Sequence, residues 1–162
     1  ATQLAAKGDN DAALAALADL EKTGFGSYPV LARMRTATVE AAKGNVTKAV
    51  ELFDAVSNDA GVDAAIRDMA RLRAGLLMVD SGKYQDVATR VEVLSSEVNP
   101  LRHSAREALG LAAWKEAKAA EAEGFLKQIS DDTTAPANLV QRAYLMLDVI
   151  KASGLVSQET GN

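Results

Sequence analysis

The sequence predicts an all-α protein: a right-handed solenoid of about four helix pairs, the first truncated, followed by one C-terminal helix. Three observations support this prediction. Alanine is abundant and only 4% of the 162 residues are aromatic, which favours helices packed closely through small side chains. Four segments align on arginines that lie 38, 35 and 36 residues apart. Glycine turns and second amphipathic helices recur between these segments.

The arginine alignment identifies the first helix of each pair. The aligned segments are ARMRTATVEAAKGN, ARLRAGLLMVDSGK, AREALGLAAWKEAK and QRAYLMLDVIKASG, which place Arg33, Arg71, Arg106 and Arg142 in one phase. Gly44 and Gly82 follow eleven residues after the first two arginines, and Ala117 takes this place in the third segment. Gly8 marks the turn of the truncated first pair.

The second helices are expected over residues 11–22, 46–57, 84–97 and 119–130, where apolar residues recur at helical spacing. Pro29, Pro100 and Pro136 lie near the first turn of a following helix, where the missing N–H costs little. We therefore expect one domain over residues 1–162. Its approximate units are 1–26, 27–61, 62–99 and 100–135, with a C-terminal helix over 136–153 and a tail over 154–162.

Charge and hydropathy restrict the partners. The formal net charge is −4 and no basic tract gathers a positive field, so nucleic acid is not an expected partner. No apolar run reaches the length of a membrane span, so the chain as given is expected to be soluble. Because the chain opens inside a helix pair, we expect a further segment upstream. The absence of cysteine excludes disulfides and thiolate chemistry but fits either redox compartment.

The sequence does not predict an enzyme, a metal site or a cofactor. His103 is the single histidine, and Glu107 lies four residues further on, within reach on the same helix. Such a pair is more typical of a surface or capping contact than of acid–base catalysis. Asp131 and Asp132 lack the ligand spacing of a calcium loop, and we interpret them as loop and helix-start residues.

The period near 36 residues, the glycine turn and the small residues at matched positions resemble the tetratricopeptide repeat (TPR). The resemblance implies that small residues allow close contact between helices. These repeat-packing positions are Ala37, Gly75 and Gly110 in the first helices, and Ala49, Val87 and Ala122 in the second helices. The arginines depart from the family pattern, which has a large apolar residue there.

A narrower resemblance covers nearly the whole chain. The stretches PLRHSAREALGLAAWK, ISDDTTAP and QRAYLMLDVIKASG look like the alphaproteobacterial branch of the TPR-like proteins related to YfgM. This resemblance implies a periplasmic repeat domain held at the bacterial inner membrane by an anchor that is absent from this chain. It also implies association with the Sec translocon and with a membrane-anchored periplasmic chaperone.

Carrying over the inner positions of the TPR family predicts a mostly apolar concave wall that binds a protein or peptide. Its residues are Leu31, Met34, Thr38, Met69, Leu72, Leu76, Val79, Ser104, Glu107, Leu111, Trp114 and Lys115. Three interpretations stay open: the wall is ordinary core capped by the C-terminal helix, a groove open to a partner, or a face that forms a homodimer. His103 and Trp114 share one stripe of their helix, which suggests a contact surface there.

The aligned arginines also have two interpretations. They could bind an acidic partner, or they could form internal pairs with acids such as Glu40, Asp54, Glu92 and Glu123. Internal pairing is favoured, because a guanidinium can join neighbouring repeats through bidentate contacts.

Overall fold

The computed structural model describes residues 1, 3 and 8–156. Within these residues it contains eight α-helices, one short 3₁₀-helix and no strand. The prediction of an all-α protein is therefore confirmed, and the arrangement is compatible with a helical repeat. Most of residues 1–7, where the truncated first helix is expected, lie outside the described part of the chain. The chain divides into two compact units, residues 1–77 and 78–162, at a boundary within one helix, α5.

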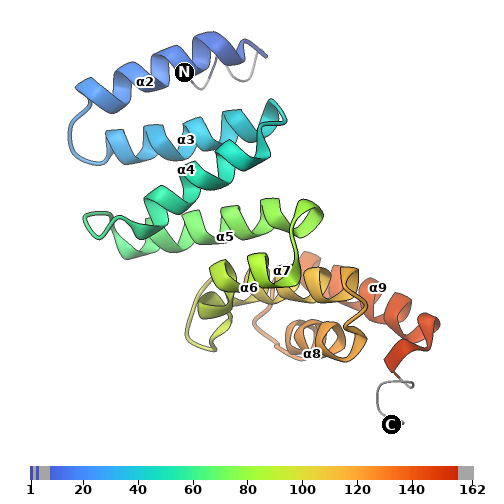
Figure 1. The fold of residues 1–162 in the computed structure, drawn as a ribbon. Coiled ribbons are helices and arrows are strands. Elements are labelled where there is room, and N and C mark those ends of the chain that lie inside the picture. The colour runs from blue at the N-terminus through green and yellow to red at the C-terminus, as the bar shows by residue number, and fades with distance from the viewer. Residues whose placement is uncertain (2, 4–7, 157–162) are drawn as a thin grey trace. The chain divides into compact units, whose positions relative to one another are not determined.

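Unit 1 contains α2 (Asn10–Thr23), α3 (Tyr28–Ala42), α4 (Val46–Asn58) and most of α5 (Ala64–Ser81). Helix α2 packs on α3, and α3 packs on α4 (Figure 1). The Asp9 side chain caps α2 by accepting a 3.2 Å hydrogen bond from the Ala12 N–H. Pro29 lies in the first turn of α3, as the sequence predicts.

The core of unit 1 is built mostly from small side chains. Leu17, Ala32 and Val39 form one buried cluster between α2 and α3. Helix α4 buries the apolar face that its periodicity predicts, namely Ala49, Val50, Phe53 and Val56. On α3, the small side chains of the buried Ala32 and Ala37 allow neighbouring helices to approach closely.

Unit 2 contains α6 (Tyr84–Val91), the 3₁₀-helix η1 (Glu92–Ser95), α7 (Arg102–Lys115), α8 (Ala119–Ser130) and α9 (Ala137–Ser153). Helix α7 packs on α8, and α8 packs on α9 (Figure 1). The core cluster includes Ala122, Leu126, Ile129, Leu139, Ala143 and Ile150. Helix α9 therefore caps the last helix pair, as one of the interpretations above expects.

The second helix expected over residues 84–97 is shorter than predicted. Helix α6 ends at Val91, and the chain tightens into η1 before the next loop. The β-branched Val91 and Val93 favour helix less than straight side chains do, and the Ser95 hydroxyl donates a 2.7 Å hydrogen bond to the Glu92 carbonyl. Such local bonds compete with a regular helix end. Leu94 still reaches the core, where it is fully buried.

Two of the helix-pair turns have the same backbone design. After α3, the Asn45 N–H donates to the Glu40 carbonyl at 2.9 Å, and after α7 the Lys118 N–H donates to the Ala113 carbonyl at 3.0 Å. The residue before each donor is left-handed: Gly44 has φ +85° and Ala117 has φ +59°. This is the Schellman arrangement that ends many helices, in which glycine is preferred. The aligned position of Ala117 thus carries real backbone strain.

Candidate functional site

Two adjoining cavities lie between α3 and α5 in unit 1. Their volumes are about 390 Å³ and about 450 Å³. Arg35 and Arg73 line both cavities, so the two form one feature, which we call the α3–α5 groove. Its lining residues are Leu31, Met34, Arg35, Thr38, Ala41, Phe53, Ala65, Ile66, Met69, Arg73, Leu76 and Leu77.

The groove follows one face of each helix because its residues recur at helical spacing. On α3 the face runs from Leu31 to Ala41, and on α5 it runs from Ala65 to Leu77. Leu31 is 50% exposed and Leu76 is 42% exposed. Side chains of this size are usually covered, so the groove leaves apolar surface open to a ligand.

Arg73 is held over the floor of the groove. Its Nη1 donates a 3.3 Å hydrogen bond to the Thr38 hydroxyl, and its guanidinium lies 6.0 Å from the centre of the Phe53 ring. Arg35 is half-buried, and its Nε is buried without a hydrogen-bond partner. No acidic residue belongs to the lining of either cavity. The groove therefore combines an apolar floor with two positive charges that nothing in the lining neutralises.

The aligned arginines behave differently, because each contacts an acidic side chain of the chain itself. Their partners are Asp59 for Arg33, Asp68 for Arg71, Glu97 for Arg106 and Glu107 for Arg142. Internal pairing, the favoured interpretation, is thus what the structure shows. None of these four partners is among the acids suggested from the sequence; Glu40 pairs with Lys48 and Glu123 pairs with Lys127.

Arg106 is the most deeply placed of these four arginines. It is 3% exposed, and it donates to the carbonyls of Ser95 at 3.2 Å and Gln128 at 3.4 Å besides contacting Glu97. These contacts join η1, α7 and α8. Arg106 is therefore a structural residue of unit 2, because its donors are used within the protein.

Five residues of the predicted concave wall lie in the α3–α5 groove: Leu31, Met34, Thr38, Met69 and Leu76. Leu72 does not belong to an open wall, because it is 5% exposed and lies on the buried side of α5 with Ala70 and Ala74. The helical stripe that includes Leu72 spans both the buried side and the edge of the open face. Leu72 and Leu76 are four residues apart, so their side chains point in directions that differ by about 40° around the helix axis.

The remaining wall residues lie in unit 2 and serve the packing of that unit. Glu107 accepts hydrogen bonds from the Arg142 Nε at 2.6 Å and Nη2 at 2.9 Å, which ties α7 to α9. Lys115 caps the end of α5 by donating to the carbonyls of Val79 and Asp80. Trp114 packs against the core cluster of unit 2 and is half-buried. Ser104, Leu111 and Val79 are also half-buried.

The repeat-packing residues lie at contacts between helices. Ala37, Ala49, Val87 and Ala122 are fully buried, and Gly75 is buried on α5. A Cβ added at Gly110 would lie 3.0 Å from Leu126 Cγ and 3.5 Å from the Ala122 carbonyl oxygen. Helix α8 therefore packs directly on the backbone of α7, which only a very small residue allows.

His103 points inward, and its partner is not the predicted one. The ring is 5% exposed, and Nε2 lies 2.8 Å from Asp132 Oδ2 in the loop between α8 and α9. Arg102 and Thr134 also bind the Asp132 carboxylate. Glu107 pairs with Arg142 instead. The suggested contact surface at His103 is wrong, because the imidazole is enclosed by the protein.

The electrostatics of this cluster fit a structural role. Hydrogen bonds from Thr134 and His103 hold the pKa of Asp132 well below its ordinary value of 3.8. Asp132 is thus ionised at neutral pH and accepts a hydrogen bond from Nε2–H of His103. The cluster joins the start of α7 to the α8–α9 loop.

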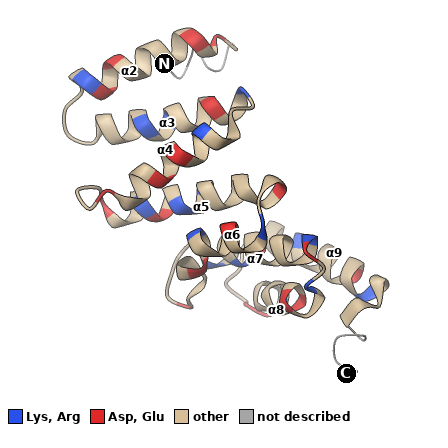
Figure 2. Ribbon diagram, viewed as in Figure 1, with Lys and Arg blue, Asp and Glu red and all other residues tan. Residues whose placement is uncertain are grey.

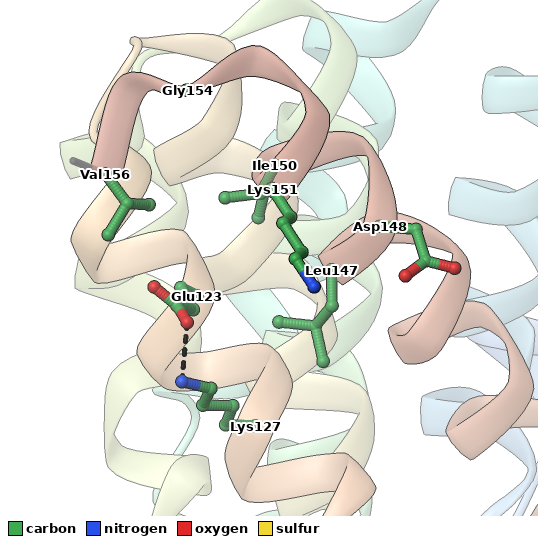
Figure 3. Close-up of a pocket in the computed structure, with 8 residues that line it drawn as sticks. All are labelled: Glu123, Lys127, Leu147, Asp148, Ile150, Lys151, Gly154 and Val156. Carbon is green, nitrogen blue, oxygen red and sulfur yellow. Dashed lines mark ion pairs between the residues drawn. The ribbon is translucent and has the colours of Figure 1, made fainter.

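A third cavity, of about 440 Å³, lies in unit 2 between α8 and α9 (Figure 3). Leu147, Ile150 and Val156 contribute apolar surface. Its charged lining consists of two acids, Glu123 and Asp148, and two lysines, and Glu123 forms a 2.5 Å ion pair with Lys127. Unlike the α3–α5 groove, this cavity therefore has no excess of either charge in its lining.

The sequence analysis missed the two groove arginines. Arg35 and Arg73 each lie two residues after an aligned arginine, Arg33 and Arg71, so they share one repeat phase. Figure 2 shows in blue that α3 and α5 both carry basic residues. The third and fourth segments have Ala108 and Tyr144 at this phase. An arginine two residues after the aligned arginine is therefore a recurring feature of the sequence, but of only two repeats.

Among residues 1, 3 and 8–156, no group of three or more His, Cys, Asp or Glu side chains is arranged to hold a metal ion. In the same part of the chain, no helix is long and apolar enough to span a membrane. Comparisons with protein-family models, with curated proteins and with solved structures found no match to this chain. The site therefore has to be interpreted from its own chemistry.

Proposed function

We propose that this protein is a non-enzymatic interaction module, a TPR-like right-handed solenoid that binds a segment of another protein in the α3–α5 groove. The groove itself is the observation that carries the proposal. It presents the exposed side chains of Leu31 and Leu76, with the half-buried Met69, beside two cations on a face formed by two helices. Apolar surface of this kind on a soluble domain marks an interaction site, and methionine adapts to varied apolar partners.

The length of the groove fits a peptide segment. From Leu31 to Ala41 the α3 face extends about 15 Å at the helical rise per residue. An extended chain of about four or five residues covers this distance, and so do about three turns of helix. The open face suits a polypeptide that lies across it.

Photocrosslinking in living cells tests this proposal. A photoreactive residue is placed at Leu76 in the groove and, as a control, at Val98, which is 92% exposed in unit 2. We expect discrete adducts from the Leu76 position that disappear when Leu31→Asp is added. Adducts of equal intensity at both positions, or none at Leu76, would contradict the proposal.

We extend the proposal to the partner through the resemblance of three sequence stretches to YfgM-related proteins. The domain would face the periplasm at the inner membrane and associate with the Sec translocon and a membrane-anchored chaperone. Mass spectrometry of the Leu76 adducts tests this extension. Translocon or chaperone peptides are the expected result, whereas adducts made up of cytoplasmic proteins would refute it.

Self-association is a second candidate function, favoured by the outer face of α9. Tyr144, Leu145 and Val149 are 54%, 62% and 48% exposed on this capping helix. If two copies pair through this face, light scattering will show a dimer that Leu145→Lys dissociates. A monomer at every concentration would rule out this candidate and leave the groove proposal intact.

A further inference from the structure

We infer that the partner segment carries an aspartate or glutamate side chain between two apolar side chains, and that Arg35 and Arg73 bind its carboxylate. This inference rests on the proposed function, since it names the chemistry of the segment that the groove takes. It follows from the pairing of the arginines, from their position along the groove and from the net charge of the chain.

Pairing separates the groove arginines from the other arginines of the same helices. Arg33 places both Nη atoms 3.2 Å from Asp59, and Arg71 lies 3.0 Å from Asp68. Among the described residues, no carboxylate forms an ion pair with Arg35 or Arg73. Arg35 is half-buried and its Nε has no hydrogen-bond partner, whereas Arg73 is exposed at the surface of the groove. A carboxylate is the group whose geometry fits guanidinium donors best.

The position of the two arginines along the groove indicates that the carboxylate belongs to a residue inside the partner segment and not to its terminus. Both arginines line both cavities, so they lie at the junction between them. On one side of the junction the lining is Leu31, Met34, Ile66 and Met69, and on the other side it is Ala41, Phe53, Leu76 and Leu77. A segment with apolar side chains on both sides of its carboxylate fills both cavities. A chain terminus at the junction would leave one of them empty.

The net charge of the chain implies that the carboxylate is recognised by direct contact and not by long-range attraction. The chain has a formal net charge of −4, so its overall field repels an acidic segment instead of attracting it. Binding of such a segment must therefore come from direct contact with the two guanidinium groups. Phosphate-rich polymers would gain little from two cations on an acidic protein.

Fluorescence anisotropy with synthetic peptides tests the inference. The probe is a short labelled peptide, amidated at its C-terminus, with leucines on both sides of one central glutamate. One matched peptide has glutamine at the centre. Another has the leucines followed by a free C-terminal carboxylate. We expect the glutamate peptide to bind about tenfold more tightly than the glutamine peptide, because charge-assisted hydrogen bonds to two guanidinium groups are lost in the latter.

Substitutions assign this preference to the groove. Arg73→Gln should remove most of the difference between the glutamate and glutamine peptides. Lys22→Gln, which removes one positive charge from an exposed position of α2, should leave it unchanged. Arg35→Gln should act in the same direction as Arg73→Gln. Because Arg35 is half-buried and this variant could disturb the fold, Arg73→Glu gives a second test: it should prefer a peptide with a central lysine.

The outcomes separate the inference from the proposed function. If the glutamate and glutamine peptides bind equally and Leu76→Asp abolishes both, the groove binds apolar segments and the inference is wrong. If the peptide with the terminal carboxylate binds most tightly, the internal position is wrong. If no peptide binds, the proposed function fails together with the inference.

Discussion

The contact between α7 and α8 makes a quantitative prediction about glycine. Gly110→Ala adds a methyl group whose carbon would lie 3.0 Å from Leu126 Cγ and 3.3 Å from Leu126 Cδ2. Ordinary carbon contacts lie at about 3.5–4.0 Å, so something has to move. Leu126 is fully buried in the core cluster, so moving it disturbs the side chains packed around it. We therefore expect overpacking to outweigh the better helix propensity of alanine.

The magnitude follows from two opposing effects. Replacing glycine by alanine inside a helix stabilises it by about 1 kcal/mol, and overpacking a core costs about 1–3 kcal/mol. The expected net result is a loss of about 1 kcal/mol in the free energy of unfolding, which lowers Tm by about 3 °C in a protein of this size. Gly124 on α8 is the matched control, because a Cβ there meets nothing within 4 Å. Gly124→Ala should raise stability by about 0.5–1 kcal/mol.

Urea and thermal unfolding followed by circular dichroism measure both variants. A double-mutant cycle with Leu126→Ala adds a direct test of the contact, because removing the leucine should relieve the cost of Gly110→Ala. Stabilisation by Gly110→Ala equal to that by Gly124→Ala would refute the close approach of the two helices.

Three further predictions concern unit 2. Ala117→Gly should stabilise the protein by about 1 kcal/mol in urea unfolding, because the left-handed conformation penalises a Cβ; unchanged or lower stability would contradict the strained turn. Asp132→Asn should destabilise the fold at neutral pH, and the difference from the wild type should shrink as acid protonates Asp132 below its ordinary pKa of 3.8. A constant difference down to strongly acidic pH in thermal melts would exclude a stabilising carboxylate. Trp114→Ala should lower Tm while peptide binding in the α3–α5 groove is unaffected, and loss of peptide binding in a folded variant would assign Trp114 to the binding surface.

Much of the local structure was predictable. The aligned arginines and turn glycines indicated the helix pairs, and the apolar periodicity identified the buried faces of α4 and α8. The 3₁₀ segment after α6 was not predicted, because weak helix propensity at Val91 and Val93 competes with a pattern that continues to Leu94. Propensity acts through small differences per residue, which packing and local hydrogen bonds can override.

The candidate site was predicted only in part. The spacing on α5 placed Leu72 and Leu76 on one stripe, yet one is buried and the other is 42% exposed. Helical spacing fixes the angle between side chains but not which part of the helix surface its neighbours cover. Arg35 and Arg73 share one repeat phase, but the sequence does not show which of several arginines lacks an acidic partner.

The sequence by itself therefore determined the all-helical class, the repeat phase and the positions of the turns, because these depend on residues close together along the chain. Only the tertiary structure decided that His103 meets Asp132, that Arg142 meets Glu107, and that the α3–α5 groove stays open. Partners of that kind lie about 30 residues apart or more. Their choice depends on how each helix is rotated against its neighbours, which the packing of many side chains sets together.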